Sequence, residues 1–147
     1  MQTFKLSAFA IIFNDQKEVL LCHRRDHDLW NLPGGGVQKD ETPWEAVVRE
    51  AKEETGFDVV VEKLSGVYFK TGQETIAFAF VCRIKSGTLT LNDEADDIKY
   101  FSLEKIPDNF SAKQKGRIKD ALANSEVVMK TETGPSSIEL TKNSKVN

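Results

Sequence analysis

Short apolar runs separated by polar turns cover most of the chain, and their lengths are typical of β-strands. Residues 5–13 and 19–25 are rich in apolar and β-favouring side chains and predict the first two strands. Residues 58–70 and 74–87 predict two longer strands, joined by a turn at residues 71–73. The chain therefore begins as a strand-rich domain.

The second half of the chain has weaker patterns. Residues 88–107 predict two short extended pieces around an acidic loop, and residues 111–125 have weak helical periodicity. From about residue 131 the sequence is polar, which is typical of a loosely held tail. No repeat or linker divides the chain, so we expect one domain at 1–130 and a flexible polar tail at 131–147. Strands and helices alternate irregularly, which predicts an α+β fold with a mixed β-sheet flanked by helices.

The most clearly delimited element is a helix between Thr42 and Gly56. Thr42 is a suitable N-cap, Pro43 fits the first helical position, and Glu45 completes a T-x-x-E capping box. Gly56 suits the left-handed residue just past the helix end. Apolar positions recur at i, i+3 and i+4 spacing, so the following side chains are expected to pack on the sheet: Trp44, Val47, Val48, Ala51 and Thr55.

Three carboxylates of this helix share a second face. Glu50, Glu53 and Glu54 are three or four residues apart, so they lie close together beside the apolar stripe. In the last helical turn the helix dipole disfavours negative charge by a few tenths to about 1 kcal/mol per residue. A solvated acidic face is one explanation. The other is a bound divalent cation, since Mg²⁺ and Mn²⁺ prefer carboxylate and carbonyl oxygens.

A glycine turn precedes the helix. Gly34, Gly35 and Gly36 follow Pro33, and residues without a Cβ let a ligand or metal approach the backbone closely. The turn matches neither the P-loop, because no Gly-Lys-Ser/Thr follows, nor the dinucleotide-binding fingerprint, because the spacing differs. The glycines alone are therefore compatible with a tight loop or with a binding site.

Taken together, the glycines and the helix resemble the Nudix box, G-x5-E-x7-R-E-U-x-E-E-x-G-U, in which U is a bulky apolar residue. All fixed positions are present, and Ala51 is smaller than the usual residue at the first U position. The matching residues are Gly35, Glu41, Arg49, Glu50, Glu53, Glu54, Gly56 and Phe57.

The resemblance implies an α/β/α sandwich and an enzyme that hydrolyses a nucleoside diphosphate linked to another moiety, with Mg²⁺ or Mn²⁺ as cofactor. It implies that Glu50, Glu53 and Glu54 bind the metal, together with a backbone carbonyl of Gly34 or Gly35. Arg49 would orient the glutamates, or would only be a surface partner of Glu45 or Glu53. Glu41 would brace the loop against the helix, where Gly56 ends the box.

The general base and the substrate contacts are less defined. Glu50 is one candidate base, and the acidic loop after the box offers Glu94, Asp96 and Asp97, of which we favour Glu94. The expected catalytic set is therefore Glu50, Glu53, Glu94 and Arg49. The expected substrate contacts are Arg24, Arg25, Gly35 and Gly36, although His23, Arg24 and Arg25 would also fit a solvent-facing strand end.

Composition narrows the partners. The chain has 147 residues and a net charge of −3, which gives no general attraction to nucleic acid. The apolar run at residues 7–13 is too short for a secretory signal or a membrane span, so we expect a cytoplasmic protein. Cys22 and Cys82 lie in apolar runs and are expected to be buried thiols. We expect a nucleoside triphosphate or ADP-ribose type of substrate, and a homodimer stays open. The alternative is a catalytically weak Nudix domain that senses or binds a nucleotide.

Overall fold

The computed structural model describes residues 1–136. The elements in chain order are β1 (Lys5–Ile12), β2 (Val19–Arg24), β3 (Trp30–Asn31), β4 (Gly34–Gly36), α1 (Pro43–Thr55), β5 (Phe57–Lys70), β6 (Thr75–Gly87), β7 (Ala95–Phe101), the 3₁₀ helix η1 (Leu103–Lys105), α2 (Ala112–Ala123) and β8 (Val128–Glu132).

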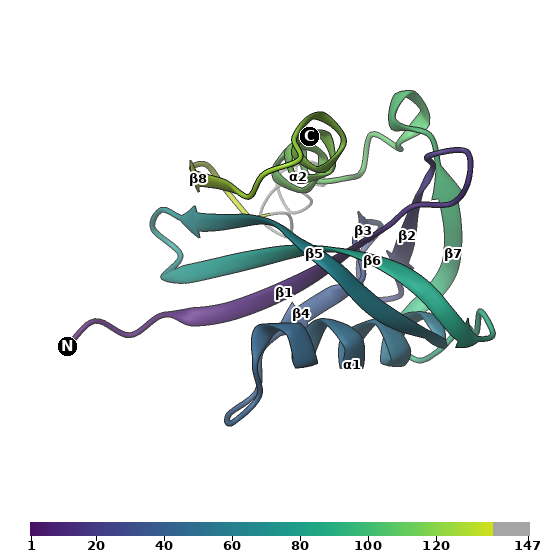
Figure 1. Cartoon of the computed structure of the whole chain (residues 1–147), viewed down its shortest axis with the longest axis horizontal. Helices are drawn as coiled ribbons and strands as arrows, with labels where there is room; N and C mark the ends of the chain where they lie inside the picture. Colours follow the sequence, from purple (N-terminus) through teal and green to yellow (C-terminus); the bar gives the residue numbers. More distant parts are fainter. Residues whose placement is uncertain (137–147) are drawn as a thin grey trace.

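The strands form two sheets instead of the single mixed sheet that the sequence suggests. The larger sheet has the order β4-β1-β6-β5-β8, and the smaller has the order β3-β2-β7. The larger sheet is mixed, because β1 runs parallel to β6 while β5 runs antiparallel to it. In Figure 1, α1 and α2 lie on opposite sides of the strands, as the expected α/β/α sandwich requires.

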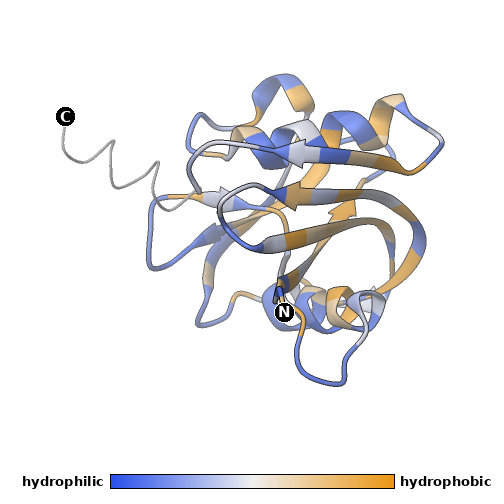
Figure 2. Ribbon diagram, turned by 90° about the vertical axis from the view of Figure 1, so that its left-hand side faces the viewer, coloured by the Kyte–Doolittle hydropathy of each residue, from blue (hydrophilic) through white to orange (hydrophobic). Residues whose placement is uncertain are grey.

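Each helix covers its own apolar cluster. Ala46, Val47 and Ala51 of α1 pack against one face of β1 and β6. Ile118 of α2 packs with Ile11 and other residues from the opposite face. Successive side chains of a strand point to opposite faces, so the apolar residues 8–12 of β1 supply both clusters. Figure 2 shows the apolar residues concentrated on the strands between the helices.

The ends of α1 are as predicted, but its packing face differs. Thr42 Oγ1 accepts a hydrogen bond from Glu45 N–H at 3.1 Å, and Gly56 has a left-handed φ of 84°. Trp44 and Val48, which were expected in the core, are 57% and 37% exposed, whereas Ala46 is buried. The helix turns its small side chains to the sheet, which allows close approach of the backbones and leaves the indole outside.

One further expectation, for residues 88–107, needs correction, whereas the domain limits stay a prediction. Between residues 88 and 107 the structure has one strand, β7, and the 3₁₀ helix η1, while residues 88–94 make a loop instead of a second extended piece. The strand β8 pairs in parallel with β5 and reaches Glu132, two residues past the expected domain end at 130. Residues 137–147 of the expected tail lie outside the described residues, so its flexibility stays a prediction. Within residues 1–136, no helix is long and apolar enough to cross a membrane.

Candidate active site

The glycine strand β4 lies between β1 and the C-terminal half of α1. Gly34 pairs with Phe9 of β1 and donates its N–H to Glu54 Oε2 at 2.8 Å. A Cβ on Gly35 would lie only 2.8 Å from Glu50 Oε1. Any side chain at position 35 would therefore displace the Glu50 carboxylate, so the turn and the acidic face of the helix form one site.

Arg49 forms hydrogen bonds with three carboxylates around the helix. Its Nε donates to Glu41 Oε2 at 2.7 Å and its Nη2 donates to Glu41 Oε1 at 3.0 Å, which fixes the loop before the helix. Its Nη1 donates to Glu50 Oε1 at 3.0 Å and to Glu53 Oε2 at 3.1 Å, and its Nη2 also reaches the carbonyl of Gly36. One guanidinium thus contacts three carboxylates, more than the single surface partner that the sequence allowed as an alternative.

Glu54 carries the largest electrostatic cost in this cluster. Burial raises the pKa of its carboxyl to about 8, and the negative charges of Glu50 and Glu94 add to the shift against the stabilising bond from Gly34 N–H. Burial also raises the pKa of Glu50, although Arg49 opposes the shift. A cation at this position would reverse both effects, because opposite charge favours the ionised carboxylates.

The donor set fits a hard divalent cation. Carboxylate oxygens of Glu50 and Glu54 and the backbone beside them are the oxygen ligands that Mg²⁺ and Mn²⁺ prefer. Among residues 1–136, no three His, Cys, Asp or Glu side chains are close enough to hold a metal as they stand. The contacts explain this, because Arg49 engages Glu50 and Glu53 while Glu54 accepts from Gly34. A metal bound by these carboxylates would therefore require rotation of their side chains.

The three candidate bases after β6, Glu94 in the loop and Asp96 and Asp97 in β7, have different surroundings. Asp96 is bonded to His23 at 2.7 Å, and Asp97 pairs with Lys99 at 3.2 Å. Glu94 has no hydrogen bond or ion pair from its side chain to the described residues, while its backbone N–H bonds Asn92 Oδ1 at 2.8 Å. Of the three, only Glu94 borders the cavity beside the helix carboxylates.

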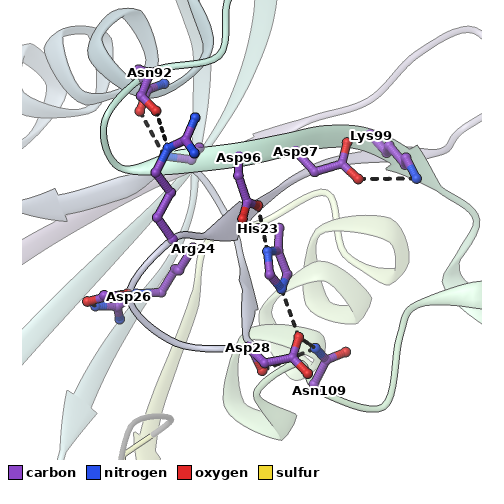
Figure 3. A network of polar contacts seen from close by, with 11 residues as sticks. His23, Arg24, Asp26, Asp28, Asn92, Asp96, Asp97, Lys99 and Asn109 are labelled. Atoms are coloured by element: carbon purple, nitrogen blue, oxygen red, sulfur yellow. Dashed lines mark hydrogen bonds and ion pairs between the residues drawn. The ribbon is translucent and has the colours of Figure 1, made fainter.

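The end of β2 is occupied by ion pairs. His23 lies between Asp96 and Asp28, with its two ring nitrogens 2.7 and 2.8 Å from their carboxylates (Figure 3). Partial burial lowers the pKa of His23, but these two hydrogen-bonded carboxylates outweigh it and raise the pKa overall. Arg24 pairs with Asp26 (Figure 3). Arg25 Nε donates to the carbonyl of Asn92 at 2.6 Å.

The glycine turn, Glu54, Glu94 and the end of β2 border one cavity of about 570 Å³. Its wall includes Gly34 and Gly35 of β4, Glu54 of α1, Arg24 at the end of β2 and Arg25 just after it. The structure thus brings both expected arginines and the glycine turn to a single cavity, whereas Gly36, Glu50 and Glu53 are not part of its wall.

Comparison with known proteins assigns the chain to a family. The sequence pattern of the NUDIX domain matches residues 3–122. The chain belongs to the Nudix family. A MutT-like protein of Streptomyces ambofaciens is 31% identical over 80% of this chain and 76% of its own length. A Bacillus subtilis (strain 168) protein named for 8-oxo-dGTP diphosphatase activity is 33% identical over 77% of this chain and 76% of its own length. The crystal structure of an ADP-ribose pyrophosphatase from Streptococcus suis 89-1591 superposes with a TM-score of 0.74 at 28% identity, covering 88% of this chain and all of that one.

Two features of this Nudix domain escaped the sequence analysis. Asn92 Nδ2 donates to the carbonyl of Glu54 at 2.6 Å, so Asn92 ties the acidic loop to the end of the box helix. The Asn-Asp-Glu sequence of this turn was a usable signal, because Asn often accepts N–H bonds from the residues that follow it. The other feature is the far wall of the cavity, which includes Lys70 and Gln114. No local pattern marks either of these residues as part of a site.

Proposed function

We propose that this Nudix protein is a hydrolase that cleaves the pyrophosphate linkage of a nucleoside diphosphate derivative. The observation that carries the proposal is Glu54, a carboxyl whose ionisation is unfavourable until a cation arrives, on the wall of a cavity of about 570 Å³. A cation bound there would face the part of a ligand that carries the most negative charge. A diphosphate group meets that description.

The family generally uses divalent metals, and Mg²⁺ or Mn²⁺ is the ion that the oxygen donors of this site favour. When bound, the ion would neutralise phosphoryl oxygens and lower the pKa of a bound water. Glu50, Glu53 and Glu54 would hold it, with a carbonyl of Gly34 or Gly35. Arg49 would position the glutamates through its contacts with Glu50 and Glu53.

Glu94 is the proposed general base. Its side chain has no ion-pair partner among the described residues and borders the cavity, so it is available to accept a proton from the attacking water. Arg24 and Arg25 are proposed to contact phosphate oxygens from the other side of the cavity. Arg24 is held by Asp26 and Arg25 by the Asn92 carbonyl, so each would exchange or share an existing contact.

The proposed substrates are nucleoside triphosphates or ADP-ribose. The relatives support both, since one is named for 8-oxo-dGTP and a similar structure is an ADP-ribose pyrophosphatase. We propose a small nucleotide and not a nucleic acid as the partner, in the cytoplasm, where the free thiols of Cys22 and Cys82 would stay reduced. Gel filtration of the purified protein tests the homodimer.

The experiment is a substrate screen with Mg²⁺, with Mn²⁺ and with excess EDTA. The panel comprises unmodified and oxidised nucleoside triphosphates, ADP-ribose, NADH, nucleotide sugars and dinucleoside polyphosphates. We expect turnover of at least one compound with metal and none in EDTA, and the products separate pyrophosphate release from release of a nucleoside monophosphate. Tight nucleotide binding without turnover of any panel member would instead support the non-catalytic binding module.

A further inference from the structure

Lys70 occupies the wall of the cavity at the end of β5. Its Nζ lies 5.8 Å from the centre of the Phe9 ring, and Phe9 pairs with Gly34, whose N–H bonds the Glu54 carboxylate. Both Phe9 and Lys70 line the same cavity as Glu54. The ammonium therefore belongs to the substrate cavity, separated from the box carboxylates by the Phe9 side chain and the glycine strand.

Among the described residues, no carboxylate forms an ion pair with this ammonium, and Glu132, which pairs with Arg117, acts on it only as a nearby charge. Among the described residues Lys70 has no side-chain hydrogen bond and no ion pair, and its only close contact of this kind is the Phe9 ring. Burial, together with the positive charge of Arg117, lowers its pKa to about 8, although the negative charge of Glu132 opposes this shift. A half-buried cation without a partner is unfavourable, and such groups are concentrated at sites that bind ligands.

The neighbouring charges are already engaged. The Arg117 guanidinium packs between the Phe9 and Tyr68 rings and pairs with Glu132 at 2.6 Å, and it does not line the cavity. Lys113 Nζ donates to the carbonyl of Gly134 at 3.0 Å. Lys70 is thus a single cation at this end of the cavity, without the several donors that a second phosphate group normally requires.

Neutral amide side chains line the same cavity, together with the apolar Phe9 and Leu32. Gln114 and Asn31 line the cavity with Lys70. Gln114 Oε1 is used by the Leu32 N–H at 2.8 Å, which leaves the amide N–H groups of Gln114 as its remaining donors. One ammonium beside neutral amide donors suits a neutral group that carries carbonyl oxygens. An amino group at the same position would place its own N–H donors against the ammonium.

We propose that Lys70 selects the nucleobase of the substrate by donating a hydrogen bond to a carbonyl oxygen of the base, in preference to bases that carry an amino group there. The proposal rests on the proposed function, because it assigns the part of a nucleotide that lies beyond the diphosphate. It divides the candidate substrates, since bases with a carbonyl at this position should be favoured over adenine.

Nucleotide pairs that exchange a ring carbonyl for an amino group, with the adjacent ring nitrogen protonated only in the carbonyl member, test the proposal. ITP and ATP differ in a carbonyl or an amino group at position 6 of the purine, and UTP and CTP differ in the same way at position 4 of the pyrimidine. We expect kcat/KM of the wild-type protein to favour the carbonyl member of at least one pair by about tenfold or more. Lys70→Met should lower kcat/KM for that member by about tenfold to a hundredfold and leave its amino counterpart within about threefold.

Two further variants separate recognition from folding. Lys63→Met removes an exposed lysine from the same strand and should leave the preference unchanged. Lys70→Arg keeps a charged donor and should retain most of the preference. The melting temperature of Lys70→Met should not fall, because it loses an unpaired ammonium. Equal losses on both members of each pair, or no loss at all, would overturn the proposal.

Binding of the monophosphates keeps this test separate from catalysis. Calorimetric titration of wild type and Lys70→Met with IMP, AMP, UMP and CMP measures the preference without turnover. A Lys70-dependent preference without hydrolysis would contradict the proposed function and support the base selection. Hydrolysis without a Lys70-dependent preference would support the proposed function and contradict the base selection. If none of the four monophosphates binds in a way that depends on Lys70, the proposed role of Lys70 is also contradicted.

Discussion

Replacing Glu54 by Gln should stabilise the metal-free protein at alkaline pH. The carboxyl has a pKa of about 8 in the folded protein, mainly through burial, against an ordinary value of 4.5. The unfolded chain therefore loses this proton near pH 4.5 and the folded protein only near pH 8. Between these values the folded state binds more protons, so stability falls as pH rises.

The size of the effect follows from the same two values. At 1.36 kcal/mol per pH unit, the full difference corresponds to ~5 kcal/mol above pH 8. Glu54 is only half-buried, and water and side-chain movement relieve part of this cost, so we expect about 1–3 kcal/mol. In a domain of this size 1 kcal/mol shifts Tm by roughly 2–4 °C. Gln keeps an oxygen that can accept the Gly34 N–H.

Thermal unfolding in EDTA from pH 5 to pH 9 measures this directly. Glu54→Gln should match wild type at pH 5 and melt several degrees above it at pH 9. Glu53→Gln is the matched control, because it removes an exposed carboxylate that pairs with Arg49 and should leave Tm unchanged or slightly lower throughout. Adding Mg²⁺ at pH 8 should raise Tm of wild type more than that of Glu54→Gln. A Tm of Glu54→Gln below wild type at pH 9 in EDTA would refute the reasoning.

Two other substitutions test the proposed roles around the box. Arg49→Lys loses the paired contacts to Glu41. It should therefore weaken activation by Mg²⁺ and lower kcat/KM by about tenfold to a hundredfold, which a metal titration of the rate measures. An unchanged metal dependence would mean that Arg49 has only a structural role. Glu94→Gln should lower kcat by about tenfold or more at an unchanged Tm, and a normal rate beside a slow Glu50→Gln would move the base to Glu50.

Local patterns predicted the elements that local forces define. The box helix begins at Thr42 and ends at Gly56 because both capping positions act within one helical turn, so their residue types suffice. The strands β5 and β6 were recognisable because apolar and β-favouring residues are frequent in both and a short turn joins them. Residues of the box were identifiable for a different reason, since their spacing resembles that of a known family.

Contacts between distant segments could not be read in the same way. Periodicity places Trp44 on the apolar stripe, but the choice of small side chains for the close approach depends on the facing sheet. His23 and Asp96 meet across 73 positions of sequence because β2 and β7 pair in a separate sheet. The contribution of Lys70 to the cavity likewise depends on the end of β5 lying beside Phe9 of β1.

The charges of the site explain why its stability and its proposed activity favour different states. One guanidinium, that of Arg49, serves Glu41, Glu50 and Glu53, and it makes no contact with Glu54. The metal-free protein reduces the remaining repulsion by keeping Glu54 protonated near neutral pH, which lowers the negative charge available to a cation. A metal held by Glu50, Glu53 and Glu54 would therefore displace that proton and loosen the contacts of Arg49. A more complete set of ion pairs would stabilise the fold, but it would leave fewer carboxylate oxygens for the metal.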